Sequence, residues 1–400
     1  MKSHILQLAA IARKRTRLII GLMSGTSLDG LDVALCAFTG AGSRTRVKVL
    51  HFKTLPYDAH FKDEIRRVFA KKEIDFQHLV LLNVLIAERH ADIVNRCLAD
   101  WNIAAEDVDL LASHGQTVYH APRVLHGLPG YPNATLQIGD GDHLARRTGI
   151  ITISDFRQKH LAAGGEGAPL ALYGDFFLFS KKGENRFLLN IGGIANFTYL
   201  PADGDTTQAF ATDTGPGNTL IDAFARALFG VPYDENALLA KAGRVDERLL
   251  DILKADPFFA KPFPKTTGPE LFSPEWVQAA FRQLPKGNPN PYDLMATLTK
   301  LTADTIVDAL DRVSQSPIPN PQSLYLSGGG AHNPLIAKHL KAMLPGWKIK
   351  PMKALGVDGD AKEAVLFAVL ANETVAGSTT TGTKLGGIPL VGMGKISFPG

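Results

Sequence analysis

Cysteine is scarce in this chain: only Cys36 and Cys97 occur among its 400 residues. Neither lies at a spacing typical of metal ligands, so the sequence offers no cysteine-based metal site. So few thiols in so long a chain favour a reducing compartment. We therefore expect a cytoplasmic protein.

Long apolar runs are also absent. A helix needs roughly 20 consecutive apolar residues to cross a bilayer, and the longest candidate, residues 78–87, is interrupted by Asn83. This run fits a buried helix, and we expect no membrane partner.

No strong excess of one charge is present. The net charge is +4, and the basic residues are dispersed apart from a cluster at residues 13–17. This pattern predicts no nucleic-acid partner but is compatible with an anionic small molecule. The basic segment 1–17 predicts a short surface helix or a frayed end, with a targeting peptide as the alternative.

The remaining composition, 45% hydrophobic and 20% charged, is that of a globular protein of two or three domains. Strand-like and helix-like segments alternate, which predicts an α/β fold. Residues 17–38 and 186–200 each predict a hairpin with a polar, glycine-containing tip, and helical sequence follows each one. One unit therefore occurs twice, which predicts two domains with a nucleotide between them.

Later segments give further elements. Clusters of helix breakers at 256–274 and 285–291 predict loops around a helix near 275–283. The apolar period from Leu294 to Leu310 predicts a long helix that is stopped by the prolines at 317–321, and a strand follows at 323–326.

Three glycine-bearing turns follow apolar runs. Their candidate phosphate ligands are Gly21, Ser24, Gly25, Thr26, Ser27, Asp29 and Gly30; then Gly192, Gly193 and Asn196; then Gly328, Gly329, Gly330 and Asn333. Backbone N–H groups unobstructed by side chains can surround phosphate oxygens, and the third turn also leads into a helix. Any one of them alone could be a plain tight turn.

The chain lacks the G-x-x-x-x-G-K-[ST] and a well-placed G-x-G-x-x-G pattern, which excludes two common nucleotide folds. We therefore predict that ATP is gripped by hairpin tips from two lobes. Asp29 would orient Mg²⁺ through its water shell.

Asp213 is the candidate catalytic base, because it ends a short strand-like stretch just before a helix that begins near Thr219. A carboxylate there can take a proton from the attacking group in phosphoryl transfer. The alternative is a turn aspartate that binds its own backbone. Asn218 is the expected N-cap of the helix.

Polar residues also follow the apolar run 108–112, at a predicted strand end where α/β proteins place ligand contacts. His114, Gln116 and Thr117 could bind a polar substrate there, or His114 could be purely structural. In a helix over 360–371, Asp360 and Glu363 have the spacing of a capping box.

The chain resembles the 1,6-anhydro-N-acetylmuramic acid kinases, which recycle bacterial cell wall. The motifs that carry the resemblance stand in the family's order over nearly the full length: residues 21–30, 113–117, 165–170, 189–196, 213–218, 264–268 and 328–333. The resemblance implies the actin/Hsp70/sugar-kinase fold, an RNase H-like unit duplicated into two lobes around an ATP cleft, and a homodimer. Lobe I would span residues 1–154 and be rejoined by 376–400, and lobe II would span 155–375 and hold an adenosine loop.

The resemblance also implies a reaction and its residues. Water opens the 1,6-anhydro bridge at C1 while O6 takes the γ-phosphoryl group of ATP, with Asp213 as the base and Glu363 as a substrate contact. The segment 158–160 departs from the family pattern of two basic residues and an aspartate, and places Lys159 among the substrate candidates. Levoglucosan kinase therefore stays open as an alternative, and a non-catalytic ATP-binding protein of the same fold is a second one.

Overall fold

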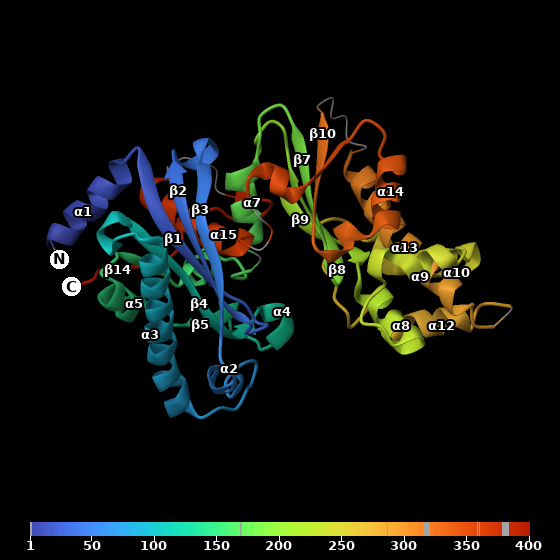
Figure 1. The fold of residues 1–400 in the computed structure, drawn as a ribbon, viewed down its shortest axis with the longest axis horizontal. Helices are drawn as coiled ribbons and strands as arrows, with labels where there is room; N and C mark the ends of the chain where they lie inside the picture. The colour runs from blue at the N-terminus through green and yellow to red at the C-terminus, as the bar shows by residue number, and fades with distance from the viewer. Residues whose placement is uncertain are drawn as a thin grey trace. The chain divides into compact units, whose positions relative to one another are not determined.

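The computed structural model describes residues 2–168, 170–285, 287–314, 321–357, 359, 361–377 and 384–400. The chain forms two compact units, one made of residues 1–180 with 356–400 and the other of residues 181–355 (Figure 1). Each unit has its own β-sheet covered by helices, as expected for an α/β protein.

The first unit is built on one mixed sheet. Its strands are β1 (Thr16–Ser24), β2 (Gly30–Thr39), β3 (Arg46–Pro56), β4 (Leu110–Ala121), β5 (Ala134–Ile138), β6 (Thr152–Ser154) and β14 (Lys395–Ser397). They are ordered β14-β6-β4-β1-β2-β3, with β5 beside β4. β1–β2 and β2–β3 are antiparallel, whereas β4 is parallel to β1 and β6 to β4. A separate small pair is formed by β12 (Lys384–Leu385) and β13 (Ile388–Pro389).

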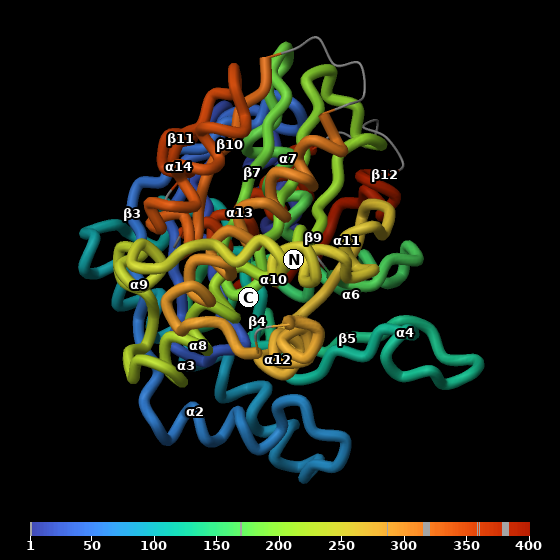
Figure 2. Tube along the Cα trace, turned by 90° about the vertical axis from the view of Figure 1, so that its right-hand side faces the viewer, coloured from blue at the N-terminus to red at the C-terminus, as the bar shows by residue number. Residues whose placement is uncertain are grey.

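The second unit repeats this arrangement. Its strands are β7 (Asn185–Ile191), β8 (Ile194–Leu200), β9 (Phe210–Pro216), β10 (Gln322–Ser327) and β11 (Lys348–Pro351). Their order is β11-β10-β7-β8-β9, with β7–β8 and β8–β9 antiparallel and β7–β10 and β10–β11 parallel. β11, β10 and β7 lie side by side in this order in Figure 2. The series β3-β2-β1-β4-β6 thus recurs as β9-β8-β7-β10-β11 with the same directions. This confirms the predicted duplication of an RNase H-like unit.

Helices cover both faces of the first sheet. They are α1 (Lys2–Arg13), α2 (Ala59–Arg66), α3 (Phe76–Trp101), α4 (Arg123–His126), α5 (Gly141–Thr148), α6 (Phe156–Ala162), α7 (Ala171–Phe179) and α15 (Lys362–Ala376), with short turns η1 (Gly42–Arg44) and η2 (Ala105–Asp107). Ile20 and Leu22 of β1 belong to a core shared with α3 and α5. Gly21 points the other way, and a Cβ there would lie 1.9 Å from the carbonyl oxygen of Ala364 in α15. The glycine therefore permits the close approach of α15 to the sheet.

Helix α13 connects two cores of the second unit. The helices there are α8 (Thr219–Phe229), α9 (Leu238–Ala242), α10 (Glu247–Lys254), α11 (Pro257–Ala260), α12 (Pro274–Phe281), α13 (Pro291–Ser314) and α14 (Pro334–Met343), with η3 (Glu235–Ala237), η4 (Gly329–His332) and η5 (Met352–Leu355). Leu298 and Leu301 of α13 pack with α8, α10 and α12. Ile306 and Leu310 pack with β7, β8 and α14. The long apolar period in the sequence reflects burial along the whole helix.

Most predicted elements are confirmed. The two hairpins are β1–β2 and β7–β8, the long helix is α13, and the helix near 275–283 is α12. The prolines at 317 and 319 and the proposed capping residue Asp360 lie outside the described residues. Two predicted strand-end positions were wrong: residues 113–117 lie inside β4, and Asp213 lies inside β9, not at the strand ends. β4 continues because residues beyond Gly115 pair with β5.

The unit boundaries lie at residues 180 and 355, whereas 154 and 375 were expected. The difference has a physical cause, because α15 packs on β1, β2, β4 and α7 of the first unit. The end of the chain also joins this unit, since β14 pairs with β6.

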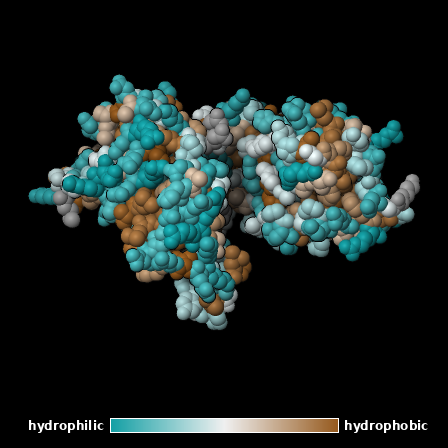
Figure 3. Space-filling model, turned by 60° about the horizontal axis from the view of Figure 1, so that its bottom comes forward, coloured by the Kyte–Doolittle hydropathy of each residue, from teal (hydrophilic) through white to brown (hydrophobic). Residues whose placement is uncertain are grey.

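One face of α3 is exposed and apolar. Leu82 and Ile86 are buried, as expected for this run, but Phe76 is 73% exposed and Leu81 is 61% exposed, with Leu85 also exposed. Figure 3 shows apolar side chains at the surface of the left-hand part of the molecule, to which α3 belongs. The expectation of a buried helix therefore holds for one face only. None of the described helices is long and apolar enough to cross a membrane.

Candidate active site

The turn between β1 and β2 presents hydroxyl groups at its tip. Thr26, Ser27 and Asp29 are exposed there. Leu28, with a positive φ of 60°, turns its side chain into the core. The buried leucine anchors the turn while its polar neighbours stay accessible to a ligand.

A buried hydrogen-bond chain supports this turn from below. Tyr57 Oη lies 2.7 Å from His90 Nε2 and donates to Ser24 Oγ at 3.0 Å. Ser24 Oγ in turn donates to Gln116 Oε1 at 2.5 Å, and Gln116 Nε2 donates to the carbonyl of Gly25 at 3.3 Å. Ser24 and Gln116 are both predicted ligand contacts. The structure shows that both are buried and that their side-chain hydrogen bonds stabilise the turn.

His114 lies beside Arg157 in the first unit. Arg157 Nε donates to His114 Nε2 at 3.0 Å, and Arg157 Nη1 donates to the carbonyl of Gly167 at 2.7 Å. Burial, and then the nearby guanidinium, lower the pKa of His114 to about 3. His114 is therefore neutral with its proton on Nδ1, and the pair presents a fixed positive charge.

Glu363 belongs to the same neighbourhood. It is exposed on the first turn of α15, yet the protein atoms crowded around it raise its pKa, the carboxylate of Asp32 raises it further, and Arg157 lowers it. The arginine and the carboxylate together can bind both acceptors and donors of a hydroxyl-rich molecule.

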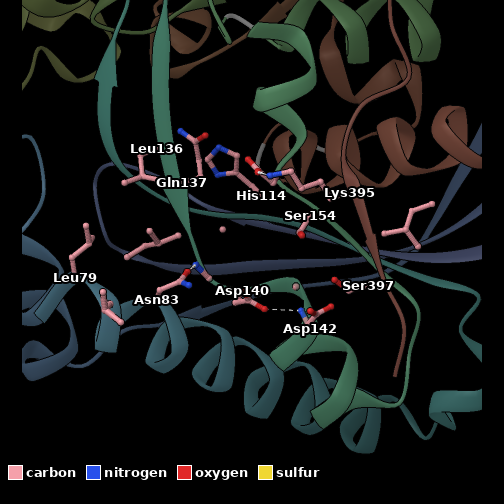
Figure 4. Close-up of a pocket in the computed structure, with 17 residues that line it drawn as sticks. Leu79, Asn83, His114, Leu136, Gln137, Asp140, Asp142, Ser154, Lys395 and Ser397 are labelled. Carbon is pink, nitrogen blue, oxygen red and sulfur yellow. Dashed lines mark hydrogen bonds and ion pairs between the residues drawn. The ribbon is translucent and has the colours of Figure 1, made fainter. Parts of the chain in front are cut away.

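A hollow of about 570 Å³ opens in the first unit beside His114 (Figure 4). Its charged side chains are Asp140, Asp142, Asp155 and Lys395, and Lys395 is paired with Asp155 at 2.5 Å. The excess of carboxylates suits hydroxyl and amide groups better than an anion.

Asp213 has one side-chain oxygen fixed and the other available. It lies in β9, opposite Asn196 of β8, and its Oδ2 accepts from the backbone N–H of Thr267 at 2.8 Å. Burial raises the pKa of this carboxyl, while the Thr267 N–H and the Lys265 ammonium lower it. No protein donor is found for Oδ1 among the described residues. A carboxylate in this state can accept a proton.

The second and third glycine turns meet at the start of α8. The N–H groups of Gly217 and Asn218 donate to the carbonyls of Gly193 and Gly192, each at 2.8 Å. A Cβ on Gly330 would lie 2.3 Å from Ile191 Cγ2. The structure therefore brings Gly192, Gly193 and Gly328–Gly330 together, and the close contact requires glycine.

Two asparagines beside the turns, the expected N-cap Asn218 and the predicted phosphate contact Asn333, have structural roles. Asn218 stands at the N-cap of α8 as expected, but its side chain caps no N–H and instead donates to the carbonyl of Ile191 at 3.3 Å. Asn333 is the N-cap of α14, and its Oδ1 accepts from the N–H groups of Leu335 and Ile336. Gly21 and Gly30 lie in strands and not in the turn itself.

A hollow of about 420 Å³ is lined by residues of α9, α13 and α14, the helix that follows the third turn. Apolar side chains that include Val245, Ala303 and Leu335 line it together with Lys241, Lys300 and Lys338. An apolar slot that is also lined by lysines suits a flat base attached to phosphates. No group of three or more His, Cys, Asp or Glu side chains in the described parts of the chain is placed to hold a metal ion.

Comparison with known proteins decides the family. The family model described as anhydro-N-acetylmuramic acid kinase matches residues 17–388. The chain belongs to the anhydro-N-acetylmuramic acid kinase family. Curated members with full-length similarity come from Pseudoalteromonas atlantica (51% identical, 100% of each chain) and Caldanaerobacter subterraneus (37% identical, 98% of this chain and 100% of that one). Among solved structures, a ROK hexokinase from Thermus thermophilus matches at 13% identity over 88% of this chain and 97% of that one, with a TM-score of 0.34.

Membership in this family confirms the resemblance that the motifs indicated. The structure shows what the three residues of the divergent segment 158–160 contact. Gln158 Nε2 donates to the carbonyl of Thr135 at 2.7 Å, and His160 Nδ1 accepts from the N–H of Gly167 at 2.9 Å. Lys159 is exposed and lines a different hollow, which includes neither His114 nor Glu363. These three residues shape the segment around Arg157.

Several residues of the site were not predicted from the sequence. Arg157 could have been found, because it directly precedes the divergent segment 158–160, and Thr267 lies in the motif 264–268. Tyr57 and His90 gave no signal, since neither belongs to a motif and their contacts join segments far apart in the chain.

Proposed function

We propose that this protein is an ATP-dependent kinase that opens 1,6-anhydro-N-acetylmuramic acid with water and phosphorylates O6, giving N-acetylmuramic acid 6-phosphate in cell-wall recycling. The observation that carries the proposal is Asp213, whose carboxylate has one oxygen held by the Thr267 N–H and a second one available, in a chain of this family. Asp213 takes a proton from the water that attacks C1. The C1–O6 bond then breaks, and O6 takes the γ-phosphoryl group from ATP, which leaves ADP.

The glycine turns hold ATP in this proposal. Backbone N–H groups near Gly192, Gly193 and Gly328–Gly330 bind phosphate oxygens, and Thr26 and Ser27 add hydroxyl donors from the first unit. The base occupies the hollow between α9, α13 and α14. The close packing of the second and third glycine turns and the apolar residues that line that hollow support this placement of ATP.

Magnesium accompanies ATP in the proposal. The exposed carboxylate of Asp29 and the hydroxyls of Thr26 and Ser27 are oxygen donors of the kind that Mg²⁺ prefers, so the residues fit the ion. Asp29 would hold it through water, and the bound ion would neutralise phosphate charge.

The sugar contacts are proposed at His114, Arg157 and Glu363, with the buried Gln116 holding the turn beside them. Arg157 can bind a carboxylate or a pair of hydroxyls, and Glu363 can accept from a hydroxyl. Lys159 lies at another hollow, so we assign it no sugar contact.

We further propose that the protein is cytoplasmic and forms a homodimer. Both cysteines are free and buried, which suits a reducing compartment. The exposed apolar face of α3, with Phe76, Leu81 and Leu85, is the surface that a second copy would cover.

Mass spectrometry of the products tests the activity. The purified protein is incubated with Mg-ATP and either 1,6-anhydro-N-acetylmuramic acid or levoglucosan. We expect the muramic substrate to gain one phosphoryl group and one water. Product from levoglucosan alone would identify a different anhydrosugar kinase, and ATP turnover that does not depend on sugar would contradict a kinase.

A further inference from the structure

The segment Pro264–Gly268 is fixed against the strand that carries Asp213. The N–H of Lys265 donates to Thr212 Oγ1 at 3.0 Å, and the N–H of Asp213 donates to the carbonyl of Lys265 at 2.9 Å. Lys265 Nζ donates to the carbonyls of Phe258 and Phe259, at 3.0 Å each. The segment therefore has little freedom to move relative to the carboxylate.

Thr267 touches Asp213 through its backbone only. Its N–H donates to Asp213 Oδ2 at 2.8 Å. Its hydroxyl Oγ1 is buried, and it finds no hydrogen-bond partner among the described protein atoms. Because the hydroxyl and the amide belong to one residue, the hydroxyl lies close to the carboxylate.

An unpartnered buried hydroxyl is unfavourable for folding, since it loses water without gaining a protein partner. Such a group needs an explanation, and a bound water molecule or a catalytic role is one. Here the hydroxyl and Asp213 Oδ1 are two acceptors on residues that are joined by the N–H to Oδ2 hydrogen bond, and a water molecule has two protons to donate. The β-branched threonine also limits the rotation of this hydroxyl.

We propose that Thr267 is the second residue that binds the attacking water. The inference rests on the proposed function. The water donates one hydrogen to Asp213 Oδ1 and the other to Thr267 Oγ1, so that its lone pair is directed to C1 of the sugar. As the O–C1 bond forms, the first proton passes to Asp213, the C1–O6 bond breaks, and O6 takes the phosphoryl group while ADP leaves.

Three variants test this role. Thr267→Val keeps the shape and the N–H to Asp213 but removes the hydroxyl, and Thr267→Ser keeps the hydroxyl. Thr266→Val is the matched control, because Thr266 is the exposed neighbour in the same segment. The measurements are kcat, the KM values for sugar and ATP, and the Tm of each variant.

We expect kcat of Thr267→Val to fall by about 10- to 100-fold, with the KM for ATP unchanged and Tm equal to or above that of the wild type. Thr267→Ser should keep kcat within a few fold, and Thr266→Val should match the wild type. A merely structural threonine would instead lower Tm in the valine variant. The pH at which kcat is half-maximal should stay unchanged, since the N–H bond to Asp213 is kept.

The outcomes separate the two proposals. An active wild type with an equally active Thr267→Val overturns the role of Thr267 alone. The role of Thr267 is also overturned if Thr267→Ser and Thr267→Val both lose activity and both have a lower Tm. If the wild type forms no phosphorylated sugar, the proposed function is overturned and the role of Thr267 with it.

Discussion

Arg157 Nε donates to Nε2 of His114 at 3.0 Å, so a permanently charged guanidinium is held by a histidine that stays neutral. His114 is buried next to this charge, and protonating it would place two positive charges together without water. The pair therefore carries a single positive charge, and low pH favours the unfolded chain, in which His114 can be protonated.

Acid should destabilise the protein through His114. The pKa of His114 is lowered to about 3 in the folded state, compared with 6.5 for an ordinary histidine. The unfolded chain takes up the proton first, so stability is full above about pH 6.5 and is lost as the pH falls from there towards 3. Between pH 7.5 and 5 this site should lower the free energy of unfolding by about 2 kcal/mol.

Urea unfolding at several pH values measures this loss. His114→Gln should reduce the pH dependence by about this amount without removing it, because burial also lowers the pKa of His90 to about 3. His143→Gln, at an exposed position, should leave it unchanged. An equal pH dependence in His114→Gln and the wild type would contradict the prediction.

Arg157→Lys should weaken sugar binding. A lysine ammonium cannot satisfy His114 and Gly167 with the fixed geometry of a guanidinium and still bind the substrate. We expect the KM for the anhydrosugar to rise about tenfold or more, with the KM for ATP unchanged. Arg147→Lys, at a surface arginine paired with Glu88 and Asp92, is the control; a normal sugar KM in Arg157→Lys would remove Arg157 from the site.

Asp213→Asn should nearly abolish turnover. The amide keeps the shape of the carboxylate but cannot accept the proton, so kcat should fall by about 10²- to 10⁴-fold. Binding of ATP, measured by calorimetry, should change little. The exposed Asp203→Asn serves as the control, and near-normal turnover in Asp213→Asn would exclude this residue as the base.

Gly328→Ala should damage ATP binding. Gly328 has a φ of +79°, and a Cβ there would lie 2.6 Å from the carbonyl oxygen of Ile191. Gly346 also has a positive φ, but no atom lies within 4 Å of its Cβ position. Gly346→Ala therefore reports the backbone strain alone, of the order of 1 kcal/mol.

Calorimetric titration with ATP separates the two glycine variants. We expect at least a tenfold weaker affinity for Gly328→Ala and an unchanged one for Gly346→Ala, because only the first distorts the meeting point of the turns. Equal ATP affinities in both variants would argue against the third turn as a phosphate site.

Leu81→Lys combined with Leu85→Lys should separate the proposed dimer. The two residues lie one helical turn apart on the exposed face of α3, and burying two ammonium groups in an interface is unfavourable. Light scattering should give twice the chain mass of 43.1 kDa for the wild type and a single chain for the variant. Leu228→Lys, at an exposed leucine of α8, should remain dimeric, and a wild-type mass of one chain would contradict the dimer.

The sequence determined the local elements. The β1–β2 and β7–β8 hairpins, α13 and the three glycine turns follow from periodicity and turn chemistry, because these depend on residues close together in the chain. Asp213 could be singled out in the same way, as a carboxylate at the end of a strand-like stretch. The order of the motifs also pointed to the family.

Only the tertiary structure decided which side chains meet. Arg157 reaches His114 across 43 residues, and Ser24 reaches Gln116 across 92. The assignment of α15 to the first unit likewise depends on its packing on β1. Such contacts arise when distant segments fold together to bury apolar surface, so no local pattern encodes them, and the partners of Asp213 and His114 became visible only in the folded chain.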